Sequence, residues 1–335
     1  MSLSPEKAYQ ELSQIFATRH EHNQTLEIEI LPPSFGTLLH DGCSVGITKK
    51  VLVGAFVAAR RMFFEKQSSI STEEELYEDE DVLRASEILI LLAPEHVTAC
   101  NWRKRRLIRI LQSTSDDVLE ILDKELTLTA SYLCSPLHRH TKSPTLWQHR
   151  LWVLRRILSI RDPGETPEAI QSLLQSELSI VLRSGELHPR NYYAFSYMRQ
   201  LHTLLSKTGP EAEDITIALL ERTVSWCQAN TRDISGWMFA LYLLDGIPDR
   251  RDVQARVVNT VVRFALDIGW TGESLWTFVD LAIRKTGVVD AVRGLLKTSP
   301  GEHNGTTLSG KSWKTWLGMA ETYWAAAGDH QESQT

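Results

Sequence analysis

The sequence predicts an all-α protein, an α-α superhelix in which about five to six helical hairpins stack as a solenoid. From Val82 onward, apolar residues recur with the period of a helix, and no convincing run of alternating strands interrupts them. Short turn-rich stretches separate the helical patterns, as expected for hairpins with tight connections. These stretches are Asp162-Pro163-Gly164, Gly209-Pro210 and Asp245-Gly246-Ile247-Pro248. Segments centred on a large apolar residue also return at a nearly constant interval, which is typical of repeat proteins.

Five anchor residues mark the repeat, at intervals of roughly 40 to 50 residues, the length of two helices with two turns. The anchors are Cys100, Trp147, Phe195, Trp237 and Trp276. Further helical patterns lie between the anchor segments, at residues 116–137, 167–184, 212–228 and 252–268. Because a single hairpin cannot cover its own apolar stripe, we interpret the anchors as the packing surface between neighbouring repeats.

An arginine follows three of the anchors after three or four positions, on the same side of the helix. These arginines are Arg103, Arg150 and Arg199. We expect them to cross-link turns and helix ends rather than to bind a substrate. Whether the basic run from Arg103 to Arg106 forms a partner-binding patch or simply faces solvent stays open.

The composition is that of a soluble globular protein, with 42% hydrophobic and 23% charged residues. A formal charge of -6 argues against a broad nucleic-acid surface, so no nucleic-acid partner is expected. The four cysteines form no CxxC pair, which excludes the usual zinc-ribbon and redox motifs. No apolar run is long enough for a transmembrane segment, and no signal peptide is recognisable. The sequence therefore predicts a cytoplasmic protein.

The N-terminal third differs in pattern from the repeats. Residues 5–17 predict a short amphipathic helix, residues 26–31 (LEIEIL) a short extended segment, and residues 50–65 a buried helix. The stretch that follows is polar and acidic with few large apolar side chains, and predicts an exposed linker. We expect four regions: an N-terminal region at 1–67, the acidic linker at 68–81, the hairpin repeats at 82–327 and a disordered tail at 328–335.

The anchor segments carry a recognisable motif. The stretch WQHRLWVL from Trp147 resembles the pattern N-Y-x-x-W-x-x-R-R-x-L-L, with Arg150 in place. Asn191 and Tyr192 keep the N-Y start of the next repeat, where Phe195 replaces tryptophan. The segments at Trp237 and Trp276 resemble later repeats of the same pattern, whereas the first repeat is degraded, with Cys100 at the tryptophan position. On these residues the chain resembles the protein prenyltransferase α-subunit repeat family, over roughly residues 82–296.

The resemblance implies the non-catalytic α subunit of a heterodimeric protein prenyltransferase of the geranylgeranyltransferase type. The partner would be a β subunit, with the Rab geranylgeranyltransferase β type favoured, and that subunit would hold the zinc and most of the isoprenoid pocket. Geranylgeranyl diphosphate would be the substrate, with farnesyl diphosphate as the alternative. The acceptor would be a protein with a C-terminal cysteine, for which a SNARE is one candidate. The rival hypothesis is a helical-repeat scaffold without an enzymatic partner, motivated by the degraded first repeat and the altered third one.

Two residues are singled out by the resemblance. Lys142, five positions before Trp147, matches a family lysine that points at the prenyl diphosphate across the interface with the β subunit. A positive charge there would stabilise the leaving diphosphate. Tyr193 stands where the family has a histidine, and its phenol could donate a hydrogen bond to phosphate. The alternatives are a solvated loop lysine for Lys142 and a packing role for Tyr193.

No metal site and no cofactor are expected in this chain. His138, His140 and His149 are grouped, but they have neither the spacing of metal ligands nor a further partner. The C-terminal segment 311–327 contains three tryptophans with a helical pattern, and we expect it to cap the last repeat.

Overall fold

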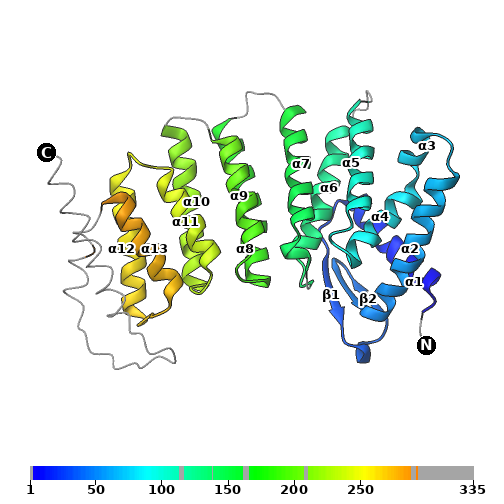
Figure 1. Ribbon diagram of the computed structural model, residues 1–335, viewed down its shortest axis with the longest axis horizontal. Coiled ribbons are helices and arrows are strands. Elements are labelled where there is room, and N and C mark those ends of the chain that lie inside the picture. The colour runs from blue at the N-terminus through cyan, green and yellow to red at the C-terminus, as the bar shows by residue number, and fades with distance from the viewer. Residues whose placement is uncertain are drawn as a thin grey trace. The chain divides into compact units, whose positions relative to one another are not determined.

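The protein is represented by a computed structural model, which describes residues 3–112, 117–137, 139–160, 166–206, 210–287 and 292 (Figure 1). The predicted cap at 311–327, the predicted tail at 328–335 and His138 lie outside the described residues. The chain divides into two compact units. The N-terminal unit comprises Met1–Glu165 and Arg183–Tyr197, and the C-terminal unit comprises Thr166–Leu182 and Met198–Thr335.

Two helices and a small sheet open the N-terminal unit. Ser4 caps α1 by accepting a hydrogen bond from the backbone N–H of Lys7 at 3.2 Å, and Asn23 ends the helix in a left-handed conformation. The predicted extended segment is confirmed as β1, which pairs in parallel with β3, while β2 pairs antiparallel with β3. The elements are α1 Pro5–His22, β1 Glu27–Leu31, η1 Pro33–Phe35, β2 Leu38–Asp41, β3 Ser44–Thr48 and α2 Lys49–Ser69.

The structure differs from the exposed linker expected at residues 68–81. Thr72 caps the short helix α3, Glu73–Glu78, and the side chain of Asp79 accepts two backbone N–H groups at the start of the next helix. Tyr77 is only 7% exposed, and its ring lies 5.8 Å from that of Trp102. Good capping residues and a single buried aromatic ring thus order a segment whose composition resembled a linker. The predicted domain boundaries themselves stay a prediction.

From Val82 onward the described residues form helices and turns, and the all-α prediction of consecutive hairpins is confirmed (Figure 1). Within each unit, successive helices run side by side. None of the described helices is long and apolar enough to cross a membrane. The helices are α4 Glu80–Leu92, α5 Val97–Gln112, α6 Val118–Leu133, η2 His140–Lys142, α7 Pro144–Ile160, α8 Pro167–Leu187, α9 Tyr192–Leu205, α10 Pro210–Ala229, α11 Ile234–Asp245, α12 Arg251–Asp267 and α13 Glu273–Thr286.

All five anchors are buried, on the helices α5, α7, α9, α11 and α13. In the N-terminal unit, the ring of Trp147 lies 4.9 Å from that of Tyr197 on the next anchor helix. In the C-terminal unit, the ring of Trp237 lies 5.1 Å from that of Phe278. In each unit, then, one tryptophan anchor packs against an aromatic ring of the next anchor helix.

Gly236 allows α10 and α11 to approach closely, and its replacement should be costly. A Cβ atom at this position would lie 2.6 Å from the Trp226 ring and 3.0 Å from the Cys227 sulfur. We expect Gly236→Ala to lower the free energy of unfolding by about 1–3 kcal/mol, measured by urea denaturation. Gly54, inside α2, is the matched control because a Cβ there meets nothing closer than 3.5 Å. Gly54→Ala should raise the free energy of unfolding by about 0.4–1 kcal/mol. If the two substitutions change the free energy of unfolding equally, Gly236 is not required for the close approach of α10 and α11.

Candidate functional site

Three anchor tryptophans make the same hydrogen bond. The indole Nε1–H of Trp147 donates to the carbonyl of Thr141 at 2.8 Å, and that of Trp237 donates to the carbonyl of Thr231 at 3.0 Å. Trp276 donates in the same way to the carbonyl of Trp270, at 2.9 Å. In each case the acceptor lies six residues before the anchor, in the loop that leads into the helix. The indole therefore fixes this loop to the anchor helix in addition to filling the core.

The two anchors without an indole show a different arrangement. The carbonyls six residues before Cys100 and Phe195 belong to Pro94 and Pro189. The Ser143 hydroxyl lies 3.3 Å from the Pro94 carbonyl, but its single proton has a closer acceptor in the Glu95 carboxylate. Lys142 Nζ donates to the Pro189 carbonyl at 3.0 Å.

Lys142 therefore gives the Pro189 carbonyl the donor that Phe195 lacks. This hydrogen bond is exposed to solvent, so it positions the ammonium rather than satisfying a buried carbonyl.

Lys142, predicted as the diphosphate contact, ends η2 and is exposed. Its ammonium has three N–H groups, and the Pro189 carbonyl takes one of them. None of the ion pairs found among the described residues involves Lys142. Two donors and an uncompensated charge are thus available to an anion at this edge of the N-terminal unit.

The loop before α9 is held against the loop before α7. Asn191 is fully buried, and its side-chain amide donates to the Thr141 carbonyl at 2.6 Å. Its side-chain oxygen accepts from the backbone N–H of Ala194 at 3.3 Å and so caps α9. The Thr141 hydroxyl and His188 Nδ1 lie 2.7 Å apart. These contacts position Lys142 relative to the first turn of α9.

Two tyrosines are exposed at that first turn. Tyr192 is 65% exposed and Tyr193, the second predicted site residue, is 44% exposed. Their rings meet edge to face with centroids 5.9 Å apart. Arg190, immediately before them, has a φ of 62°, a left-handed conformation that costs about 1 kcal/mol for a residue with a Cβ. The sequence pattern singled out neither this strained residue nor Pro189.

His140 sits beneath the loop as a neutral group. Burial lowers the pKa of His140 to about 4, and its Nε2 lies 3.1 Å from the Ile90 carbonyl. Its ring packs edge-on against Tyr132 with centroids 5.7 Å apart. At physiological pH the His140 imidazole is therefore uncharged, and it packs as part of the core. Among the described residues, no group of three or more His, Cys, Asp or Glu side chains could hold a metal ion.

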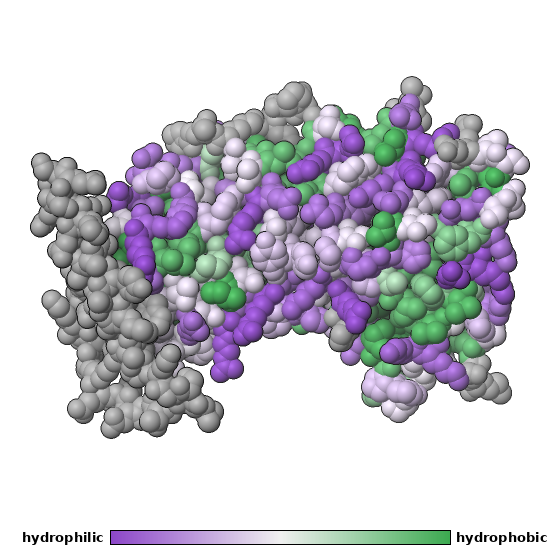
Figure 2. Space-filling view, viewed as in Figure 1, coloured by the Kyte–Doolittle hydropathy of each residue, from purple (hydrophilic) through white to green (hydrophobic). Residues whose placement is uncertain are grey.

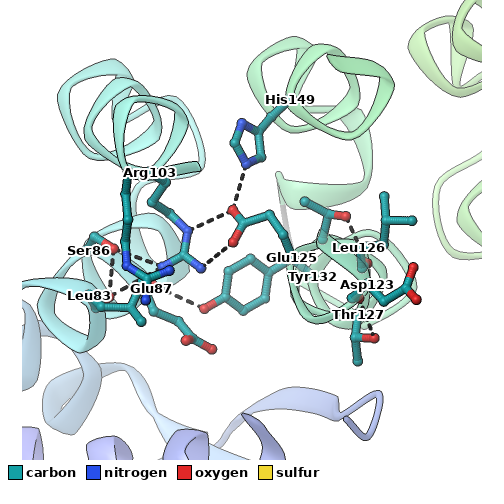
Figure 3. A network of polar contacts seen from close by, with 12 residues as sticks. Leu83, Ser86, Glu87, Arg103, Asp123, Glu125, Leu126, Thr127, Tyr132 and His149 are labelled. Atoms are coloured by element: carbon teal, nitrogen blue, oxygen red, sulfur yellow. Dashed lines mark hydrogen bonds and ion pairs between the residues drawn. The ribbon is translucent and has the colours of Figure 1, made fainter. Parts of the chain in front are cut away.

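A buried polar network lies between α4, α5, α6 and α7 of the same unit (Figure 3). Arg103 makes two hydrogen bonds to the Glu125 carboxylate, at 2.8 and 2.6 Å, and a third to the Ser86 hydroxyl. His149 Nε2 lies 2.6 Å from the same carboxylate. Burial alone would raise the pKa of Glu125, but the Arg103 charge and these hydrogen bonds hold it well below its usual value.

The three arginines that follow the anchors contact other residues of this chain. Arg103 is 3% exposed in the network, and Arg150 donates to the Leu126 carbonyl at 2.7 Å and to the Thr129 hydroxyl at 2.9 Å. The guanidinium of Arg199 lies over the rings of Phe239 and Tyr242 in the C-terminal unit. Of the basic run after Cys100, Arg105 remains exposed.

The sequence is similar to several known proteins and to one family model. A model of the ECM9 middle domain matches residues 151–265. Human protein prenyltransferase alpha subunit repeat-containing protein 1 is 27% identical over 183 residues, covering 51% of this chain and 41% of that protein. Protein ECM9 of Saccharomyces cerevisiae is 29% identical over 202 residues, covering 59% and 48%. These matches confirm the resemblance to prenyltransferase α-subunit repeat proteins.

The chain is also similar to proteins named as enzyme subunits. The geranylgeranyl transferase type-2 subunit alpha of Saccharomyces cerevisiae is 24% identical over 221 residues, covering 63% of this chain and 61% of that protein. The match to the human α-subunit repeat protein spans less than half of that relative's length.

Proposed function

We propose that this chain is the non-catalytic α subunit of a heterodimeric protein prenyltransferase of the geranylgeranyl type. The observation that carries the proposal is the exposed ammonium of Lys142, at the edge where the second and third repeats meet and where the family places a diphosphate contact. Its hydrogen bond to the Pro189 carbonyl holds it beside the first turn of α9. The similarity to type-2 geranylgeranyl transferase α subunits supports the same function.

The chemistry of prenyl transfer explains what Lys142 would contribute. The carbon–oxygen bond to the diphosphate breaks as the prenyl carbon bonds to sulfur, so negative charge grows on the leaving oxygen. A fixed cation with two unused N–H groups stabilises that charge more strongly than it stabilises the ground state. Tyr193, exposed in the first turn of α9, would donate a further hydrogen bond to phosphate. The acceptor cysteine would be activated by the zinc of the β subunit, which lowers the pKa of the thiol.

The partners follow from the same proposal. The favoured β subunit is of the Rab geranylgeranyltransferase type, because the relatives with an enzymatic name are type-2 α subunits. The prenyl substrate would be geranylgeranyl diphosphate, with farnesyl diphosphate as the alternative. The acceptor would be a protein with a C-terminal cysteine, a SNARE among the candidates.

Replacing Lys142 by alanine tests the catalytic part of the proposal. In the assembled heterodimer we expect Lys142→Ala to slow prenyl transfer by about 10- to 100-fold, with assembly unchanged. Lys142→Arg keeps the charge and should retain most of the rate. Lys7→Ala, on a lysine that is exposed far from the loop in sequence, is the matched control. Unchanged turnover in a Lys142→Ala heterodimer would remove the proposed role.

A second candidate is a helical-repeat scaffold without an enzymatic partner. The observation in its favour is the similarity to Protein ECM9, whose name states no activity. The degraded first repeat points the same way, since Cys100 replaces the tryptophan. A stable complex with a prenyltransferase β subunit would exclude the scaffold.

A further inference from the structure

One face of α2 is exposed and combines apolar with cationic side chains. Val53 is 41% exposed, Val57 is 56% exposed and Phe64 is 39% exposed. At 100° per residue, seven exposed apolar or cationic residues and Ser68 fall within about a third of the helix circumference, whereas the exposed Glu65 and Ser69 lie outside that third. In order around the helix the seven are Lys49, Arg60, Val53, Phe64, Val57, Lys50 and Arg61. We call these seven residues the α2 stripe; no acidic residue interrupts it.

The core of the N-terminal unit does not require this stripe. The opposite face of α2 packs against α1 and α4 through small and apolar residues that are almost fully buried. These are Val51, Leu52, Ala55, Ala58, Ala59 and Phe63. Selection for a stable core therefore explains the buried face but not the valines and the phenylalanine that face water.

The apolar surface continues from α2 onto the start of α5. The ring of Phe56 meets the ring of His96 edge to face, with centroids 6.5 Å apart. Val97, next to His96 in the chain, is 55% exposed. Figure 2 shows hydrophobic side chains gathered on the surface of the N-terminal unit in the region of α2. A contiguous exposed apolar surface of this kind marks an interaction site more often than scattered single residues do.

The charges of the stripe indicate an anionic partner. Lys49 and Lys50 take part in none of the ion pairs found among the described residues. Arg61 pairs with Glu6 at 3.0 Å, and the guanidinium of Arg60 lies 5.3 Å from the centre of the Phe64 ring. The chain as a whole carries a formal charge of -6, so this basic face contrasts with the rest of the protein.

We propose that the α2 stripe docks on the surface of an anionic phospholipid bilayer. Around the helix the apolar side chains form the middle of the stripe and the cations form both of its edges, over a length of roughly 22 Å. The helix can therefore lie flat with its valines and phenylalanine among the acyl chains and its cations at the phosphates. The energetic centres of protein–protein interfaces are enriched in Trp and Tyr, and neither residue occurs in the stripe. The proposal goes beyond the prenyltransferase function and does not depend on it.

The test is flotation of the full-length protein with vesicles of two compositions. One set consists of phosphatidylcholine alone, and the other contains about one third phosphatidylserine. We expect the protein to float with the anionic vesicles only, and to be released at about 1 M salt, where charges are screened within a few ångströms. Lys49→Gln/Lys50→Gln should weaken binding by at least tenfold, since each lysine near such a surface contributes about fivefold. Val57→Asp should abolish it.

Matched variants separate the stripe from general charge and hydrophobicity. Arg105→Gln/Arg155→Gln removes two exposed cations of the same unit outside the stripe. Ile268→Asp changes a residue that is 53% exposed, close to the 56% of Val57. Both controls should float like the unchanged protein, and so should Lys142→Ala, which affects only the proposed catalytic role. The proposal is overturned if no vesicles are bound, if controls and stripe variants lose binding equally, or if soluble polyglutamate binds the stripe and vesicles do not.

Discussion

Replacing Glu125 by alanine should lower the free energy of unfolding by about 3–5 kcal/mol. The Arg103 guanidinium is 3% exposed, and two of its three side-chain partners are the oxygens of this carboxylate. Without Glu125, a buried cation would remain with little compensation, and His149 would lose the partner at its Nε2. Urea denaturation, followed by circular dichroism, measures the loss directly.

Glu120 provides a control on the same helix. Its carboxylate forms an ion pair with Lys124 at 2.7 Å, but its side chain is 60% exposed. We expect Glu120→Ala to cost at most about 1 kcal/mol, because solvent screens such a pair. If both substitutions cost the same, the network in Figure 3 would not be the buried ionic core that the distances indicate.

Replacing Trp147 by alanine should cost about 3–5 kcal/mol, the second large effect. This side chain is 2% exposed, packs on Tyr197 and donates to the Thr141 carbonyl, so its removal leaves a cavity and frees the loop that carries Lys142. Trp147→Phe keeps most of the ring and loses the indole donor, which should cost about 1 kcal/mol or somewhat more. The measurement is again urea denaturation.

Trp152, on the same helix, is the matched control for Trp147. It is only partly buried and interacts with the side chains of Lys104 and Arg156 through its ring face. We expect Trp152→Ala to lower the free energy of unfolding by about 1–2 kcal/mol, because the cation–π contacts and the partly buried ring surface are lost. If Trp147→Ala is no more destabilising than Trp152→Ala, the anchors do not hold the repeats together in the way we describe.

The helices and the repeat could be predicted because their signals are local. Apolar periodicity fixes a helix within one segment, and the anchors mark equivalent positions in successive hairpins. The strand at residues 27–31 was predicted from alternation, whereas β2 and β3 were not, since a short strand is defined by its partner. Tyr77 was overlooked because one buried aromatic ring does not alter the acidic composition around it.

The contacts at the candidate site could not be predicted, because they join residues far apart in the chain. Lys142 and Pro189 are 47 residues apart, and Arg103 and Glu125 are 22 apart on different helices. One signal was nevertheless present in the sequence. Phe195 lacks the indole N–H that the anchors at Trp147, Trp237 and Trp276 donate, so the carbonyl of Pro189 accepts no hydrogen bond from its own anchor and is open to another donor.

The most direct test of the central claim is co-expression of this chain with individual prenyltransferase β subunits, followed by size-exclusion chromatography. The account predicts a 1:1 complex with the Rab geranylgeranyltransferase type of β subunit, and transfer of a geranylgeranyl group to a protein cysteine by that complex. If the chain is folded and helical but elutes alone in the presence of every β subunit, it is not a prenyltransferase α subunit, and the scaffold function replaces the proposal.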